Sequence, residues 1–149
     1  MLKTKSRRRI VAALGGALML AGAGTTGTAM ARELRAVLNG DNLTPAGDTD
    51  GWGRVAINID NLLNRLCADV EVRSVGQVTD IKIYRGRDGD TSDPIVDLQS
   101  PDDNDSNDCD TIGDELADEI QASPASFFVL VRTAEFPQGA IRGPIEPSG

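Results

Sequence analysis

Apolar and polar residues alternate along several short segments in the middle of the chain. The alternation is clearest in residues 54–60 and 66–72, where every second side chain is apolar. A period of two is typical of a strand that buries one face. Further strands are predicted at residues 35–38, 78–84 and 94–98, with a hairpin turn at Asn61–Asn64.

The C-terminal part has a different pattern. Residues 127–133 form a nearly unbroken apolar run, which is long enough for a buried strand and too short for a typical helix. Pro137-Gln138-Gly139 predicts a turn, and residues 140–143 predict a short strand after it. Because proline lacks a backbone N–H, we expect Pro144 only at a sheet edge or a strand end.

One helix is predicted at residues 113–122. Leu116 and Ile120 lie four positions apart on one helical face, and Ser123-Pro124 ends the pattern. Many short strands between turns, with a helix before the last two strands, predict an all-β fold of the sandwich or barrel type.

The N-terminal residues 1–31 are predicted to be a signal peptide. A basic stretch precedes the apolar segment Ile10–Gly24, and Ala29-Met30-Ala31 resembles a cleavage site. The apolar segment has 15 residues, fewer than the about 20 of a membrane-spanning helix. Residues 32–149 are therefore expected to form a single exported domain. Residues 6–11 fit a twin-arginine signal as well as an ordinary basic region, and a retained anchor is the alternative.

Removal of residues 1–31 would leave a strongly acidic chain. It would carry 10 Lys and Arg against 23 Asp and Glu, a net charge of −13. This balance argues against a surface for nucleic acid or for stable membrane insertion after cleavage. Simple solubility, salt adaptation and cation binding all remain compatible with it.

Cys67 and Cys109 both remain after cleavage. In an exported protein such a pair predicts a disulfide. Closing the 41 intervening residues would stabilise the fold by about 4 kcal/mol in the chain-entropy model. Cys67 falls on the polar side of its strand, so the bond would tether the acidic loop at residues 102–110 to the sheet surface.

Several motifs resemble those of the chordin-type (CHRD) domain. The run FFVLVRTAEFPQGAIRGPI resembles the closing signature of that family, which reads approximately YYVNVHT-x-x-FP-x-G-x-IRGQL. Other family segments follow in the same order, at Leu66–Asp69, Ile81–Gly86, Asp93–Leu98, Cys109 and Ser123–Phe128. The resemblance covers most of residues 32–149 and implies a Greek-key-like antiparallel β-sandwich.

Three family histidine positions hold other residues, namely Lys82, Tyr84 and Arg132. Protonated lysine and arginine do not ligate metals, so no transition-metal site is expected. If the two strands are neighbours, the three residues lie together. They then either support acidic neighbours on a solvated face or contact a small anion, a carboxylate or a partner.

A calcium loop is a further candidate site. Asp103, Asp105, Asn107 and Asp114 partly match the spacing of calcium-binding loops. The match is incomplete, because Asp108 replaces the turn glycine and the last ligand is not glutamate. Residues 88–93 form a second acidic loop, and solvated loops are the alternative in both cases.

No catalytic constellation is recognised, since the chain contains no histidine and no phosphate-binding glycine loop. Trp52 is either a platform for a sugar or, as is more usual, a packing residue. The sequence thus predicts a secreted or cell-envelope module without enzymatic activity and without a cofactor, which binds an extracellular protein or polymer or serves as a structural element. The alternatives are a calcium-dependent extracellular protein and an enzyme whose site the sequence does not reveal.

Overall fold

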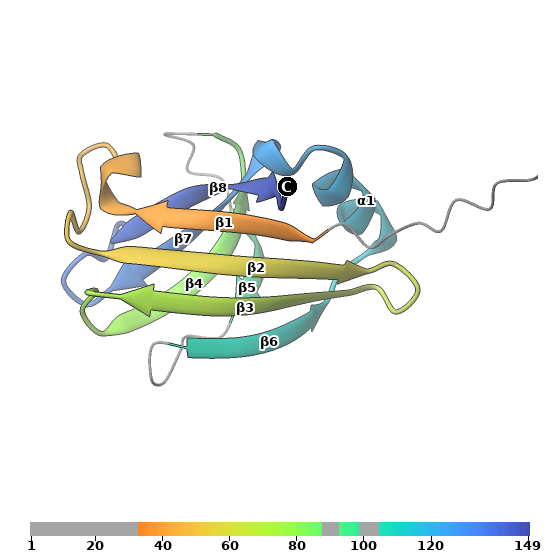
Figure 1. Ribbon diagram of the computed structural model, residues 1–149, viewed down its shortest axis with the longest axis horizontal. Helices are drawn as coiled ribbons and strands as arrows, with labels where there is room; N and C mark the ends of the chain where they lie inside the picture. Colours follow the sequence, from red (N-terminus) through yellow and green to blue (C-terminus); the bar gives the residue numbers. More distant parts are fainter. Residues whose placement is uncertain (1–32, 88–92, 99–104) are drawn as a thin grey trace, which may run out of the picture.

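The computed structural model describes residues 33–87, 93–98 and 105–149. Within these ranges the chain forms an antiparallel sheet with one α-helix before the last two strands, which confirms the predicted fold class. The strands are β1 (Leu34–Asn39), β2 (Trp52–Asp60), β3 (Arg65–Arg73), β4 (Val78–Arg85), β5 (Pro94–Leu98), β6 (Asp105–Thr111), β7 (Phe127–Thr133) and β8 (Ile141–Pro147). The helix is α1 (Asp114–Ala122), and two short 3-10 helices are η1 (Gly40–Asn42) and η2 (Pro124–Ser126) (Figure 1).

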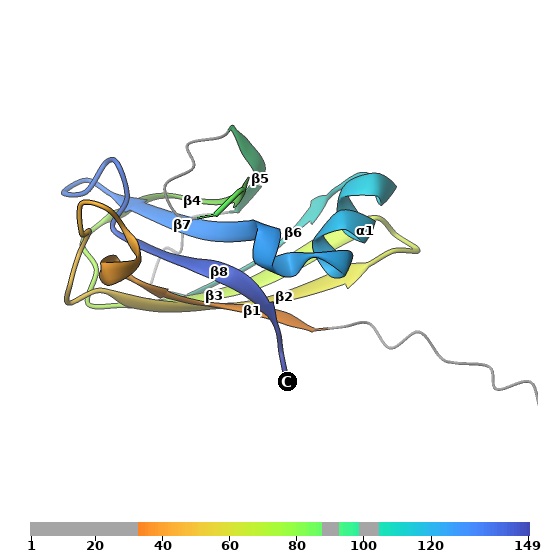
Figure 2. The ribbon, with the colours of Figure 1, turned by 90° about the horizontal axis from the view of Figure 1, so that it is seen from above.

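The strands follow the order β5-β4-β7-β8-β1-β2-β3-β6. Figure 2 shows that the sheet folds over, with β4, β5 and β7 in one layer and β1, β2, β3 and β6 in the other. β8 lies between β7 and β1 and connects the layers, and the edge strands β5 and β6 approach each other. The result is a sandwich whose sheet is nearly closed.

The core lies between the two layers and follows from the alternating pattern. Buried side chains of both layers contribute to it, among them Leu34, Leu38, Val55, Ile57, Leu66, Val70, Ile81, Ile83, Phe127, Val129, Ile141 and Ile145. α1 lies at one end of the sandwich (Figure 2) and buries Ala117 and Ile120. Arg85 of β4 makes an ion pair with Glu119, and this contact helps to hold α1.

The acidic segment differs from the prediction of a loop. Residues 105–111 form the edge strand β6, which pairs with β3 along its length, from Glu71↔Asp105 to Arg65↔Thr111. Asp and Asn disfavour strands, so the residue types gave no sign of it. Residues 102–104, which belong to the same acidic run, lie outside the described residues.

The position of Pro144 also differs from the prediction. β8 is an interior strand and extends to Pro147, with Pro144 opposite Phe128 of β7. Pairing with β1 is interrupted between Ala36↔Ile145 and Asn39↔Arg142. Pro144 lies within this interruption, where its lack of a backbone N–H removes no paired position from the β1–β8 ladder.

No helix in the described parts of the chain is both long and apolar enough to cross a membrane.

Candidate functional site

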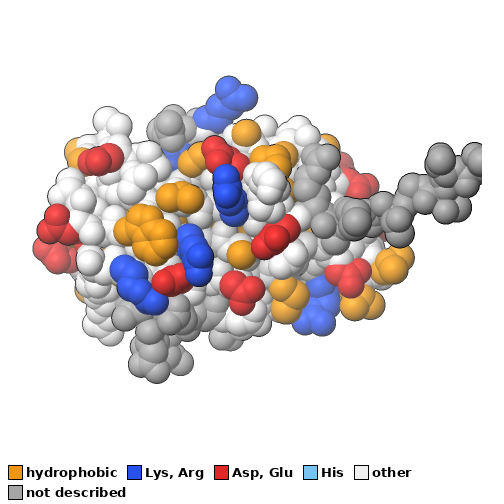
Figure 3. All heavy atoms as spheres, viewed as in Figure 1, with side chains coloured by type: hydrophobic (Ala, Val, Ile, Leu, Met, Phe, Trp, Pro, Cys, Tyr) orange, Lys and Arg blue, Asp and Glu red, His pale blue; other side chains and the backbone are white. Residues whose placement is uncertain are grey.

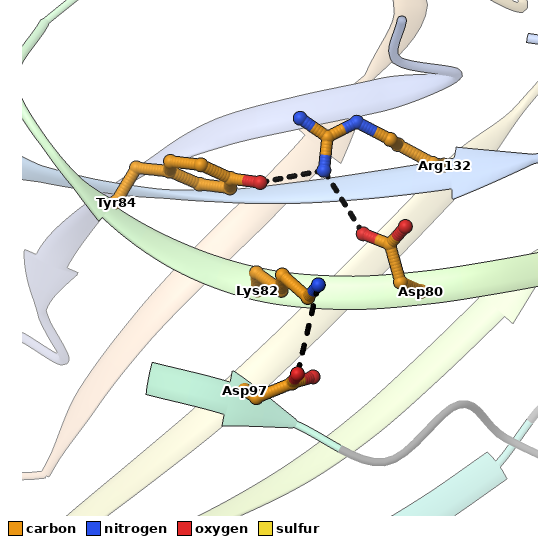
Figure 4. Close-up of polar contacts among 5 residues, drawn as sticks. All are labelled: Asp80, Lys82, Tyr84, Asp97 and Arg132. Carbon is orange, nitrogen blue, oxygen red and sulfur yellow. Dashed lines mark hydrogen bonds and ion pairs between the residues drawn. The ribbon is translucent and has the colours of Figure 1, made fainter. Parts of the chain in front are cut away.

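The outer face of β4 and β7 brings together the three residues that occupy family histidine positions. β4 pairs with β7 in the register Asp80↔Arg132, Lys82↔Leu130 and Tyr84↔Phe128. Because side chains alternate along a strand, Lys82, Tyr84 and Arg132 lie on the same face, opposite the core. Figure 4 shows Arg132 between Asp80 and Tyr84, while Lys82 points towards β5.

Arg132 is held by two neighbours on β4. One guanidinium nitrogen donates to Asp80 Oδ1 at 3.0 Å and to the Tyr84 hydroxyl oxygen at 2.5 Å. Burial lowers the pKa of the Arg132 guanidinium, but hydrogen bonds to Tyr84 and Asp80 and their charges outweigh it, so that the pKa is raised overall. Arg132 is therefore a permanent cation whose charge is already shared with its neighbours.

Tyr84 belongs to a small second apolar cluster on this outer face. Its ring stacks on Phe128, with ring centroids 5.3 Å apart, and Leu130 and the partly buried Leu43 pack beside them. The Arg142 guanidinium lies 3.6 Å from the Phe128 ring centroid and donates to the Arg87 carbonyl oxygen at 2.6 Å. Tyr84 and Phe128 are buried, so their rings are not open to a ligand.

Lys82 makes a separate ion pair across the sheet. Its Nζ lies 3.6 Å from Asp97 Oδ2 on β5, and Lys82 and Asp97 are opposite each other in the register (Figure 4). Both Lys82 and Arg132 thus face a carboxylate of the domain itself. This geometry favours the interpretation that they support acidic neighbours. Contact with an external anion stays a prediction.

The outer face of β1, β2 and β3 carries an open hollow of about 910 Å³. Ala56 lies between Arg35 of β1 and Asp69 of β3 in the register, so a short side chain is surrounded by long ones. Trp52 and Val37 line the hollow and are 39% and 49% exposed. Trp52 is therefore not a core residue. Figure 3 shows this side of the molecule, where basic, acidic and apolar side chains are mixed.

Charged side chains on this face are arranged by contacts with one another. Glu71 Oε2 lies 2.8 Å from Arg54 Nε, and Glu71 Oε1 lies 2.8 Å from a terminal nitrogen of Arg73. Next to them, the Asn107 amide of β6 donates to the Asp69 carboxylate. Of these residues, the sequence had indicated only Asn107, and as a calcium ligand. The available signal was the polar side of the alternation in residues 54–60, together with the small Ala56 among large neighbours.

Comparison with protein-family models identifies the family. A model of the CHRD domain matches residues 34–145. The chain belongs to the CHRD-domain family. The match runs from the first residue of β1 into β8, so it includes the β4–β7 face and all of the hollow except Glu33 and Ser148. Neither the curated proteins nor the solved structures contain a match.

The CHRD domain contains the expected disulfide between Cys67 and Cys109. The two cysteines are opposite each other on β3 and β6, and their Cα atoms lie 3.9 Å apart. The bond lies on the outer face of the sheet, as expected from the polar side of the Cys67 strand. It connects two paired strands, whereas the sequence had predicted a tether for a loop.

The four residues proposed for calcium are distributed over different elements. Asp105 and Asn107 lie on β6, Asp114 begins α1, and Asp103 lies outside the described residues, as do residues 88–92 of the second acidic loop. In the described part of the domain, no three acidic, histidine or cysteine residues lie close enough together to hold a metal ion. Calcium binding stays a prediction from the sequence.

Proposed function

We propose that this CHRD domain is exported and acts without enzymatic activity as a binding module at the cell surface. The observation that carries the proposal is the hollow over Ala56. It is broad, open and lined by the exposed Trp52 and by charged side chains that are already held in place. Such a surface suits contact with an extended partner.

Two observations support export. Residues 1–31 have the order of a basic stretch, an apolar segment and a small-residue site that is typical of signal peptides. The Cys67–Cys109 disulfide fits an oxidising compartment. CHRD domains are also typically extracellular.

The residue types at the two outer faces support a role in binding. General acid–base catalysis most often uses histidine, which also activates many serine and cysteine nucleophiles, and the chain has none. The carboxylates of Asp80 and Glu71 lie in ion pairs with Arg132 and with Arg54 and Arg73. Ion pairs of this kind hold side chains of a surface in fixed positions relative to one another, as a binding face requires.

The experiment uses full-length protein expressed in a host that exports it. We expect the exported protein to begin at Arg32, and we expect the purified protein to be retained by insoluble cell-envelope material. Ala56→Gln, which fills the hollow, should reduce retention, whereas Leu62→Ala at the far β2–β3 turn should not. Leu62 is a suitable control because its side chain is 95% exposed.

Each part of the proposal has an outcome that would overturn it. Protein that stays in the membrane fraction with Met1 intact would show a retained anchor instead of a cleaved signal. Equal retention of Ala56→Gln and the unchanged protein would show that the hollow is not the binding surface.

A further inference from the structure

We propose that the hollow over Ala56 binds a neutral oligosaccharide chain, with Trp52 as its stacking platform. The inference rests on the proposed binding function and names the chemical class of the partner. It is carried by three features of the outer face of β1, β2 and β3: an exposed aromatic ring, fixed polar groups and a local balance of charge.

Trp52 is placed where a ring can meet a ligand. It begins β2 and lies between Asn39 of β1 and Arg73 of β3 in the register, on the side opposite the core. Trp52 is the only tryptophan of the chain, and 39% of its surface is exposed, which is a large fraction for such an apolar side chain. An indole combines a flat apolar surface with one N–H donor. These two properties match a pyranose ring, which has an apolar C–H face and hydroxyl groups at its edge.

The polar groups beside Trp52 are held before any ligand arrives. Glu71 is fixed by Arg54 on one oxygen and by Arg73 on the other. Asp69 is the next residue along the same face of β3, and its carboxylate accepts a hydrogen bond from the Asn107 amide. Planar groups that present donors and acceptors side by side suit the neighbouring hydroxyls of a sugar. Holding them in advance lowers the entropy lost on binding.

The size of the hollow also fits. Its volume of about 910 Å³ lies within the range of about 300–1,000 Å³ for small-molecule sites. The hollow is open and runs across three strands, so the ends of a longer chain could continue beyond it. Ala56 provides the depth, because each of its register partners has a longer side chain.

The charge of this face favours an uncharged ligand. Three arginines (Arg35, Arg54 and Arg73) stand against three carboxylates (Glu33, Asp69 and Glu71) at the hollow and its edge. The rest of the exported chain is acidic, with a net charge of −13 for residues 32–149. An anionic polymer would be repelled by the molecule as a whole, and a polycation would be attracted to its more acidic parts. A neutral hydroxyl-rich chain is disfavoured by neither effect.

The test measures binding of the purified exported protein to defined neutral glycans. Cellohexaose, chitohexaose and maltohexaose are titrated by calorimetry, and insoluble cellulose, chitin and starch are used in sedimentation assays. We expect at least one of these series to bind. Trp52→Ala and Ala56→Gln should each weaken that binding by about 10-fold or more, since stacking on an aromatic ring and depth of the hollow are lost. Leu62→Ala should leave it unchanged, and thermal melting confirms that each variant is folded.

Several results would overturn the inference. These are no binding to any of the six probes, equal binding by all variants, and binding only to an anionic polymer such as alginate. A protein that sediments as a dimer, and becomes monomeric in the Trp52→Ala variant, would show that a second copy occupies the face.

Periodate oxidation separates failure of this inference from failure of the proposed function. Periodate cleaves the vicinal diols of 1,4-linked glucose chains and leaves most envelope proteins intact. Chains of 1,4-linked N-acetylglucosamine have no vicinal diol within the chain, so the oxidised material is also digested with chitinase. If the protein still binds the oxidised envelope material, and Ala56→Gln still weakens that binding, the binding function stands and the sugar assignment is wrong. If it never binds envelope material, the proposed function itself fails.

Discussion

Several residues of the closing signature have a physical explanation at the level of single atoms. Gly139 has a φ of 144°, and residues with a Cβ rarely adopt this backbone conformation. Ile141 is buried in the core, and the next residue, Arg142, covers the Phe128 ring on the outer face. Gly143 lies so close to β1 that an added Cβ would be 1.9 Å from the Val37 carbonyl oxygen. The segment therefore places Ile141 in the core, Arg142 on the outer face, and Gly143 at the close contact between β8 and β1.

We expect Gly143→Ala to lower the free energy of unfolding by about 3 kcal/mol, because the Val37 backbone would have to move. Gly76→Ala is the matched control, since an added Cβ there meets no atom within 4 Å. Urea denaturation measures the free energy of unfolding of both variants. A loss of stability no larger for Gly143→Ala than for Gly76→Ala would contradict the close approach of β8 and β1.

The contact between Arg132 and Asp80 should contribute measurably to stability. Both side chains are about one quarter exposed, at 26% and 27%, so solvent screens their attraction only in part. In a double-mutant cycle with Asp80→Asn and Arg132→Gln we expect a coupling energy of about 1 kcal/mol.

Lys82 and Asp97 provide the comparison for that cycle. Asp97 is 71% exposed and the charges lie 3.6 Å apart, so the coupling should be about 0.3 kcal/mol. Equal coupling in the two pairs would show that burial of Arg132 has no influence on the strength of its contacts.

At the scale of elements, strand β6 depends on its attachment to β3. It is an edge strand composed largely of polar residues, and β3 is its neighbour in the sheet order. Such a strand has little apolar area to hold it in place and carries several like charges. The Cys67–Cys109 bond, which crosses the pair near its middle, supplies the missing attachment.

Removal of this bond should loosen β6 before the rest of the sheet. We expect the Cys67→Ser, Cys109→Ser double variant to lose about 4 kcal/mol of stability, the value for a loop of this length in the chain-entropy model. Amide hydrogen exchange should accelerate first in residues 105–111, while the amides of β2 and β7 stay protected. Uniform acceleration across all strands would instead show that the bond stabilises only the fold as a whole.

Sequence reasoning was successful for elements whose apolar residues report burial directly. The alternation in residues 54–60 and 66–72 located β2 and β3, and the apolar run at 127–133 located β7. It failed for β6, because that strand is fixed by pairing and a disulfide and not by apolar residues of its own. It failed for Pro144 because the β1–β8 ladder is interrupted there. Such an interruption depends on how two strands pair, and the sequence of either strand alone does not reveal it.

The candidate sites were only partly accessible for the same reason. Resemblance to the family pointed to Lys82, Tyr84 and Arg132, and the β4–β7 register places them on one face. The hollow was not foreseen, because it arises from Arg35, Ala56 and Asp69 on three strands. A depression in a sheet depends on lateral neighbours, and a chain read residue by residue gives no information about them.

At the scale of the whole molecule, net charge should dominate the response to salt. Residues 32–149 carry a net charge of −13, and self-repulsion of this size destabilises a compact state. The screening length falls from about 30 Å at 0.01 M salt to about 3 Å at 1 M. We therefore expect sodium chloride to raise the free energy of unfolding over this range by about 1 kcal/mol, which corresponds to about 4 °C in melting temperature for a chain of this size.

The same measurement decides whether calcium acts through a site or through its charge. Millimolar calcium should raise the melting temperature no more than sodium chloride at equal ionic strength if the acidic segments are only solvated. A larger rise with calcium, reversed by a chelator and absent in an Asp105→Asn, Asp114→Asn variant, would establish specific binding by mass action on the folded state. The variant keeps Trp52 and Ala56, on which the proposed glycan binding depends. Glycan binding that persists in it, with and without calcium, would show that the two properties are independent.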